Sequence, residues 1–138
     1  MKKQVLTLVG VLGLLLSAGS AFAQTTTVKV DVPFNFVVSR TLMPAGTYTI
    51  SSVGMGGTLM FRGADNHALK LVNANYDTAS KPSENTRLVF RCYGDRYFLS
   101  QIWTEGSDIG RKLPKAAAET EVAMDFTSHD VILVANLR

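Results

Sequence analysis

The dipeptide Gly94-Asp95 is flanked by two runs of apolar and aromatic residues, within the segment TRLVFRCYGDRYFLSQIW (86–103). Glycine readily adopts the positive φ that the first central position of a type II′ turn requires, and such two-residue turns join antiparallel strands. Both runs are rich in β-branched and aromatic residues, which favour strands. The segment therefore predicts a β-hairpin in which Tyr93 lies directly opposite Arg96.

This turn also predicts which side chains share a face, because opposed residues of an antiparallel pair point to the same side of the sheet. Counting outward from the turn, we expect the pairs Cys92–Tyr97, Arg91–Phe98, Phe90–Leu99, Leu88–Gln101 and Thr86–Trp103. The predicted core face carries Leu88, Phe90, Cys92, Tyr97, Leu99 and Trp103. The predicted outer face carries Arg87, Arg91, Tyr93, Arg96, Phe98 and Ile102.

Cys92 is the one cysteine of the chain, so no disulfide can form within it. A thiol among large apolar side chains behaves as a small hydrophobic group and not as a nucleophile. We therefore do not expect a catalytic pair of Cys92 with His67 or His129. A covalent dimer through Cys92 would require an exposed thiol.

Other short runs of alternating apolar residues precede the hairpin. Pro33 separates the first two runs, which indicates an edge or a bend between two strands. The segment MPAG (43–46) is typical of a turn, because Pro44 presets the φ of the second turn position. Turn-forming residues between 63 and 67 separate the last two runs and predict a further strand pair. The predicted strands are 28–32, 34–38, 47–53, 58–62 and 68–76.

The rest of the chain contains one helical segment. Residues 114–124 are rich in alanine and glutamate, and Pro114 suits the first turn of a short helix of at most three turns. The segments 77–86 and 104–110 are predicted to be loops, and 130–137 is a strand expected to be covered on both faces. About eight short strands and one helix near 114–124 indicate an all-β, mainly antiparallel fold, either a β-sandwich or a small barrel.

The N-terminus has the three parts of a secretory signal peptide. A positive tip with Lys2 and Lys3 precedes the apolar run Val5–Leu16, and small residues end at Ala23. A retained membrane anchor is the alternative, although several glycines and serines make the stretch a weak span. We expect cleavage after Ala23, a signal peptide over 1–23, and a single β-rich domain over 24–138. The protein would then contact the membrane only through its signal peptide, before cleavage. After cleavage it would be periplasmic or extracellular.

Export changes the charge of the chain. The full sequence has 14 basic and 11 acidic residues, and losing Lys2 and Lys3 leaves 12 against 11. A net charge near +1 gives no reason to expect nucleic acid as a partner. Nor do two histidines and scattered acids show the spacing of a metal site, so no metal and no cofactor is expected.

The predicted outer face of the hairpin is the candidate binding surface. Guanidinium groups beside aromatic rings can bind carboxylates, phosphates or sugar rings. The alternative is an ordinary solvated face, or one that packs beneath the C-terminal strand or the helix with its arginines against Glu119, Glu121 or Asp125. The candidate ligand-binding residues are Arg87, Arg91, Tyr93, Arg96 and Phe98. No catalytic residue is proposed, because the adjacent residues Ser128, His129 and Asp130 would point to alternating faces of a strand.

Several of these segments together resemble a family of small exported bacterial proteins of unknown function. The resemblance rests on VPFNFVV, LMPAGTYTI, LVFRCYGDRYFLSQIW and GRKLPKAAAETEVA, and it extends over about residues 28–123. It departs at Met43, which stands between Leu42 and Pro44. The resemblance implies export and the extent of the domain, and it implies no catalytic residue.

Three classes of function fit these observations. The first is a non-enzymatic envelope or secreted domain that binds a partner protein or a surface polysaccharide. The second is a structural or assembly subunit, including a homo-oligomer, in which an edge strand such as Val28–Val32 pairs with another copy. The third and least favoured is a small hydrolase, which would require a concave pocket with a suitable acid or histidine.

Overall fold

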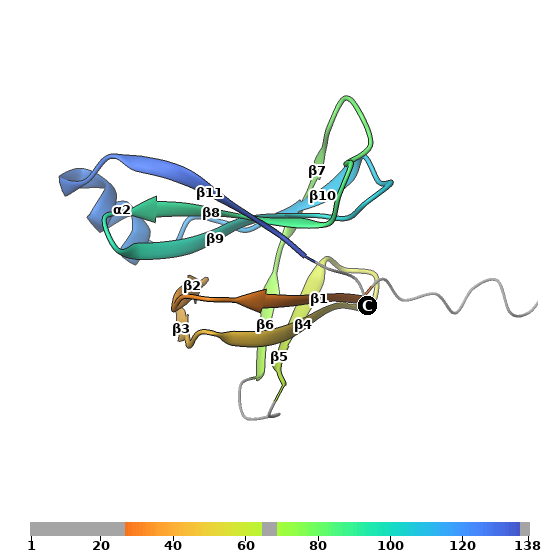
Figure 1. The fold of residues 1–138 in the computed structure, drawn as a ribbon, viewed down its shortest axis with the longest axis horizontal. Coiled ribbons are helices and arrows are strands. Elements are labelled where there is room, and N and C mark those ends of the chain that lie inside the picture. Colours follow the sequence, from red (N-terminus) through yellow and green to blue (C-terminus); the bar gives the residue numbers. More distant parts are fainter. Residues whose placement is uncertain (1–26, 65–68, 136–138) are drawn as a thin grey trace, which may run out of the picture.

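Two β-sheets stack face to face and enclose the core between them (Figure 1). The computed structural model describes residues 27–64 and 69–135, and in these it contains eleven strands and one helix. The predicted all-β, sandwich-like fold is therefore confirmed, with more strands than the eight expected. The predicted signal peptide, its cleavage after Ala23, and His67 lie outside the described residues.

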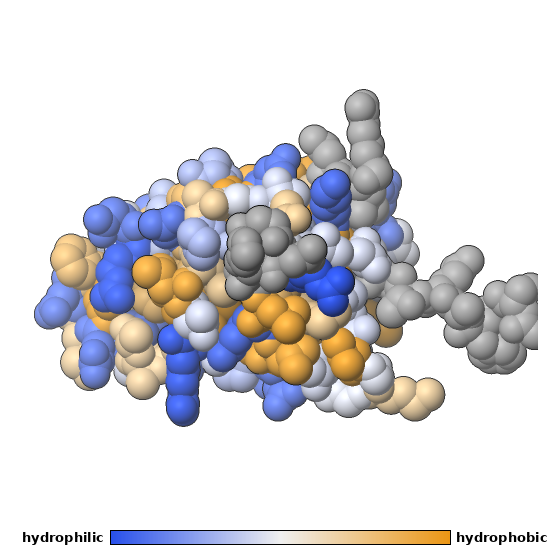
Figure 2. All heavy atoms as spheres, turned by 90° about the horizontal axis from the view of Figure 1, so that it is seen from below, coloured by the Kyte–Doolittle hydropathy of each residue, from blue (hydrophilic) through white to orange (hydrophobic). Residues whose placement is uncertain are grey.

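The first sheet has four antiparallel strands in the order β1-β4-β5-β6. Alternate residues of each strand, such as Val28 and Val30, point into the core, as their apolar periodicity predicts. The outward face of this sheet carries exposed Leu69 and Leu71 among polar residues, and Figure 2 views the molecule from this side. The strands are β1 (Thr27–Val32), β4 (Gly46–Val53), β5 (Thr58–Gly63) and β6 (Leu69–Asn73).

The second sheet has seven strands, five of which follow the order β11-β8-β9-β10-β7. The other two form a small hairpin, and one of these, β2, pairs in parallel with β9 at Val37 and Phe98. The strands are β2 (Phe36–Val38), β3 (Thr41–Met43), β7 (Asn75–Thr78), β8 (Arg87–Tyr93), β9 (Arg96–Trp103), β10 (Ile109–Lys112) and β11 (Ser128–Val134).

Aromatic rings form the centre of the core. Phe36 packs edge-on against Phe90 and against Tyr48, with ring centroids 5.7 and 5.3 Å apart. The Tyr48 hydroxyl donates a hydrogen bond to the Pro44 carbonyl at 2.6 Å, so the phenol is satisfied while its ring is buried. The two sheets are thus joined mainly by apolar packing.

The chain passes from one sheet to the other at Ala74. The sequence predicts one strand over 68–76, but this run divides into β6 in the first sheet and β7 in the second. The backbone of Gly57 lies against the crossing point, where it accepts a hydrogen bond from the Ala74 N–H at 3.0 Å. A β-carbon on Gly57 would lie 2.8 Å from the Ala74 carbonyl oxygen, and its φ of +80° also suits glycine.

The hairpin at Gly94 is confirmed near its turn and differs farther out. Gly94 has a φ of +62°, and the pairs from Tyr93–Arg96 to Phe90–Leu99 form as predicted. Beyond Phe90 the register shifts, because a β-bulge leaves Ser100 without an opposite residue. The predicted pairs Leu88–Gln101 and Thr86–Trp103 are therefore wrong. The observed pairs are Val89–Gln101, Leu88–Ile102 and Arg87–Trp103.

The bulge exchanges the faces of the last residues of β9. Ile102, predicted on the outer face, belongs to the central core, whereas Trp103, predicted on the core face, stands opposite Arg87 on the outer side. The extra residue is held in place because the Ser100 carbonyl accepts a hydrogen bond from the Leu113 N–H at 2.8 Å.

Three other expectations need correction. Residues 109–112, at the end of a predicted loop, form β10, and β7 extends into the predicted loop 77–86. The helix, α2 (Ala117–Asp125), begins later than the predicted 114–124, so Pro114 lies outside it, before the N-cap Ala116. At nine residues it is within the three turns expected. This helix, the only one in the described part of the chain, is too short to cross a membrane.

The last strand also differs from the prediction. The sequence predicts that the run 130–137 is covered on both faces, but β11 is an edge strand of the second sheet. Val131 and Leu133 pack on the core, whereas Ile132 and Val134 are 59% and 50% exposed. Consecutive apolar residues therefore do not distinguish a covered strand from an edge strand with one exposed apolar face.

Candidate functional site

The first candidate site is the outer face of the hairpin, much of which α2 covers. Tyr93 and Phe98 are each 3% exposed and form a small cluster with Val122 of the helix. Glu119, also on α2, is buried, and its carboxylate pairs with the Arg91 guanidinium. The helix thus places a carboxylate against the arginine that the sequence suggested for ligand binding, which is the alternative that the sequence analysis left open.

Two residues of β8, Arg91 and Tyr93, donate hydrogen bonds to the buried Glu119 carboxylate. One Glu119 oxygen accepts from Arg91 Nε and, at 3.3 Å, from the Tyr93 hydroxyl, and the other accepts from Arg91 Nη2 at 3.1 Å. Hydrogen bonding to Glu119 raises the pKa of Arg91. Burial, reinforced by the nearby Glu119, raises the pKa of Tyr93. The three groups together form a closed polar network beneath the helix.

The two remaining arginines of this face lie apart. Arg96 is exposed, with its guanidinium carbon 5.7 Å from the centroid of the Phe98 ring. The guanidinium carbon of Arg87 lies 6.0 Å from the centroid of the Trp103 ring, and its Nη1 donates a hydrogen bond to Ser83 Oγ at 3.0 Å. The five predicted residues are therefore divided between a covered network and two separate positions. Their role in ligand binding stays a prediction.

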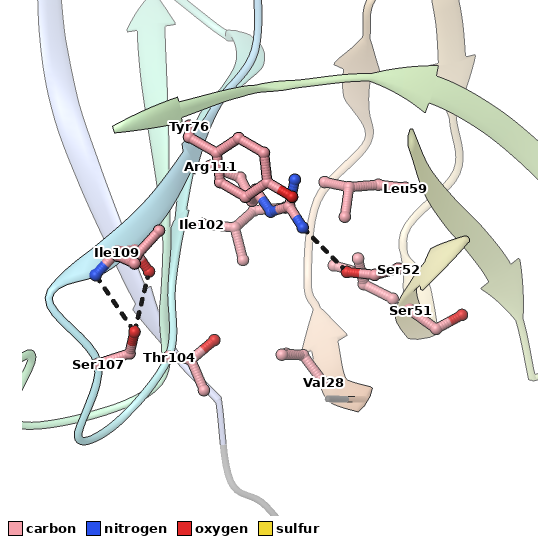
Figure 3. A pocket seen from close by; sticks show the side chains of 11 residues that line it. Val28, Ser51, Ser52, Leu59, Tyr76, Ile102, Thr104, Ser107, Ile109 and Arg111 are labelled. Carbon is pink, nitrogen blue, oxygen red and sulfur yellow. Dashed lines mark hydrogen bonds between the residues drawn. The ribbon is translucent and has the colours of Figure 1, made fainter. Parts of the chain in front are cut away.

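A second candidate site, which the sequence analysis did not identify, lies between the two sheets. It is a partly open cavity of about 200 Å³ lined by β1, β4 and β5 from one sheet and by β7, β9 and β10 from the other. Figure 3 shows its side chains, with Arg111 and Tyr76 at one end. The lining residues are Val28, Ile50, Ser51, Ser52, Leu59, Tyr76, Ile102, Thr104, Ser107, Ile109 and Arg111.

Strand register carries Arg111 into this cavity. In β10 it lies opposite Ile102 of β9 and Tyr76 of β7. Because the bulge at Ser100 turns Ile102 inward, its partner Arg111 shares the inward face. Without that extra residue, Ile102 and Arg111 would be expected on the opposite side of the sheet. The cavity therefore depends on a local irregularity of β9.

The Arg111 guanidinium crosses from one sheet to the other. Nη2 donates a hydrogen bond to Ser52 Oγ of β4 at 3.2 Å, and the guanidinium carbon lies 4.0 Å from the centroid of the Tyr76 ring (Figure 3). Nη1 is buried and has no hydrogen-bond partner among the described residues. Among the described residues no acidic side chain lines the cavity, and Arg111 is the one charged side chain of that lining.

The catalytic constellations considered from the sequence gain little support. The strand register does bring Cys92 and His129 opposite each other in β8 and β11. The Cys92 thiol is nevertheless buried and donates to the Gly94 carbonyl at 3.2 Å, whereas His129 is exposed. Asp130 follows on the same strand and lies opposite Arg91. In the described ranges, no group of three or more acidic, histidine or cysteine side chains could hold a metal ion.

One signal in the sequence could have indicated the cavity. The residues GRKLP belong to the motifs on which the family resemblance rests, and Ile109 and Arg111 alternate as strand residues do. The polar, glycine-containing segment 104–110 favours a loop, which obscures the short alternation at its end. Its position over the other sheet depends on long-range pairing, which sequence periodicity does not report.

Comparison of the chain with protein-family models, with curated proteins and with solved structures gives no match.

Proposed function

We propose that this protein is an exported, non-enzymatic binding domain that receives an anionic group in the cavity at Arg111. The observation that supports this most strongly is the buried Nη1 of Arg111, which has no hydrogen-bond partner among the described residues. Buried polar groups are nearly always hydrogen-bonded, and leaving one unsatisfied costs about 1–3 kcal/mol. An anion beside the guanidinium would compensate its charge, and a small movement of the Arg111 side chain would bring the buried Nη1 within reach of the same anion.

The surroundings of Arg111 favour anion binding over a purely structural role. A guanidinium has five N–H donors, and the hydrogen bond to Ser52 uses one of them. Tyr76 covers one face of the guanidinium and leaves donors at its edge for a ligand. The hydroxyls of Thr104 and Ser107 line the same cavity. These are the features of a small site with a few polar groups and apolar walls.

A titration of the Arg111 side chain tests the proposal. Nuclear magnetic resonance spectra of the Arg111 Nε–Hε group would be recorded while potassium acetate or phosphate replaces potassium chloride at constant ionic strength. We expect a saturable shift at Arg111 and none at Arg62, which is exposed on the outer face of β5. Arg111→Gln identifies the signal, and Arg62→Gln serves as its matched control. Equal, unsaturable drift at both arginines would contradict an anion site.

Export is part of the same proposal. It rests on the three-part signal sequence and on the resemblance to exported proteins of unknown function. An intact-mass measurement of the protein recovered from the cell envelope or the medium should match a chain that begins at Gln24. Recovery of the uncleaved chain from the membrane would instead support the retained anchor. If the protein is exported, its ligand would be an envelope component or a molecule carried in the periplasm or the medium.

Assembly through a strand edge is the second candidate. The observation that favours it is β11, an edge strand of seven residues with Ile132 and Val134 exposed. Exposed apolar edge strands readily pair with another chain. Light scattering over a range of concentrations should then show oligomers that Ile132→Lys abolishes, whereas Thr120→Lys on the exposed side of α2 would not. A monomer at every concentration would exclude this candidate.

A further inference from the structure

We infer that the ligand of the Arg111 cavity is a small aliphatic monocarboxylate, a carboxylate group carried on a short apolar chain. This inference rests on the proposed function, and it adds the chemical class of the ligand. It follows from three properties of the cavity, namely its single charge, its aliphatic walls and its size.

The single charge favours a monovalent anion. Arg111 is the one charged side chain among the described residues of the lining, so a phosphate or sulfate with two negative charges would leave one charge uncompensated there. Burying an unpaired charge is costly in an environment of low polarity. A carboxylate carries one charge and fits the edge of a guanidinium, to which it can accept two parallel hydrogen bonds.

The walls favour an apolar body on that carboxylate. Five aliphatic side chains line the cavity, three from the first sheet and two from the second: Val28, Ile50, Leu59, Ile102 and Ile109. The aromatic ring at the site, Tyr76, already lies against the guanidinium. The guanidinium therefore covers one face of this ring, and a sugar ring could stack only on the rest of Tyr76, which is 57% exposed. Within the cavity, contact with the aliphatic walls is the main source of affinity besides the charge.

The size of the cavity limits the ligand to a small molecule. About 200 Å³ leaves room for a short aliphatic chain. Pentanoate is a probe of this kind. Shorter carboxylates would leave part of the apolar wall without contact, and longer ones would extend through the open side of the cavity into water.

Isothermal titration calorimetry with a graded series of ligands tests this class. The probes are acetate, butanoate, pentanoate, octanoate, the neutral analogue pentanamide, and inorganic phosphate. Each buried methylene should increase affinity by up to about fourfold. We therefore expect pentanoate to bind at least about tenfold more tightly than acetate or pentanamide, with little further gain for octanoate.

Variants separate binding at this cavity from binding elsewhere. Arg111→Gln should abolish pentanoate binding, whereas Arg62→Gln should leave it unchanged. Because Arg111 also joins the two sheets, a second variant does not alter it. Ile109 is 52% exposed and lines the cavity, so Ile109→Asp places a competing negative charge there with little effect on folding. It should weaken pentanoate binding at least about tenfold more than Ile109→Asn does.

The outcomes distinguish this inference from the proposed function. Tighter binding of phosphate than of pentanoate, or equal binding of acetate and pentanoate, would overturn the aliphatic class and retain an anion site. Binding of pentanamide as tight as that of pentanoate would show an apolar cavity in which the charge has no role, and would overturn both. Absence of binding by every probe, with the Arg111 resonance unmoved, would also overturn both.

Discussion

The indole ring of Trp103 lies directly over Gly110, with its nearest atom 2.6 Å from the position that a β-carbon would occupy. These residues belong to the neighbouring strands β9 and β10. Because Gly110 has no side chain, the buried ring of Trp103 can lie close to its backbone. The same strand then places Arg111 toward the other sheet. Packing on the outer side of β10 and the cavity on its inner side are therefore set by adjacent residues.

Replacing Gly110 by alanine should destabilise the protein. The added methyl group would overlap the Trp103 ring, and overpacking of this kind costs about 1–3 kcal/mol. Gly46→Ala is the matched control, because a β-carbon there has nothing within 4 Å. Urea unfolding followed by Trp103 fluorescence measures both variants. Equal stability of the two would show that Trp103 moves aside without cost.

Glu119→Gln should loosen α2 from the sheet. The change leaves Arg91, whose side chain is 21% exposed, without its counterion, and we expect a loss of about 2 kcal/mol in the free energy of unfolding. Glu121→Gln on the exposed side of the same helix should change stability by less than about 0.5 kcal/mol. Hydrogen exchange of the α2 amides would locate the effect. Unchanged exchange in α2 would mean that the ion pair does not hold the helix.

The ionisation of Tyr93 should make stability fall at high pH. Burial raises its pKa above the ordinary value of 10.0, so the folded state holds the phenolic proton more tightly than the unfolded state. This contribution is fully present below pH 10 and is lost as pH rises through the raised pKa. Absorbance titration of phenolate in the wild type and in Tyr93→Phe isolates this group. Titration of Tyr93 at or below 10.0 would contradict the expectation.

The Cys92 thiol should react slowly in the folded protein. It is 1% exposed and donates to the Gly94 carbonyl, so a thiol reagent can reach it only after the hairpin opens. We expect a thiol-specific chromogenic reagent to label the native protein far more slowly than the urea-unfolded chain. The variant Glu121→Cys in a Cys92→Ser background provides an exposed thiol for comparison. Equally rapid labelling of Cys92 would revive the covalent dimer and the Cys92–His129 pair.

Local patterns in the sequence account for much of the fold. Glycine at position 94 is compatible with positive φ, and the alternation of β1 and of the inner hairpin follows from the two-residue period of a strand. These features depend on residues close together along the chain. The register from Tyr93 to Phe90 was therefore predictable, as was the burial of Cys92.

Features that depend on distant residues were not predictable in the same way. Ser100 forms a bulge although nothing in its immediate sequence distinguishes it from a regular strand residue, and it is the Leu113 N–H that bonds its carbonyl. Helix α2 has only Glu119 and Val122 buried, so its contact with the hairpin depends on the ion pair with Arg91 and on the packing of Val122 against Tyr93 and Phe98. In both places a partner far along the chain decides the outcome.

Sequence by itself determined the all-β class, the central hairpin and the candidates for its two faces, because these follow from side-chain period and turn chemistry. Only the tertiary structure decided that α2 covers the arginine and aromatic face and that Arg111 enters a cavity between the sheets. The physical reason is that a one-residue bulge reverses every side chain beyond it, and burial of an arginine depends on which strands stack against it.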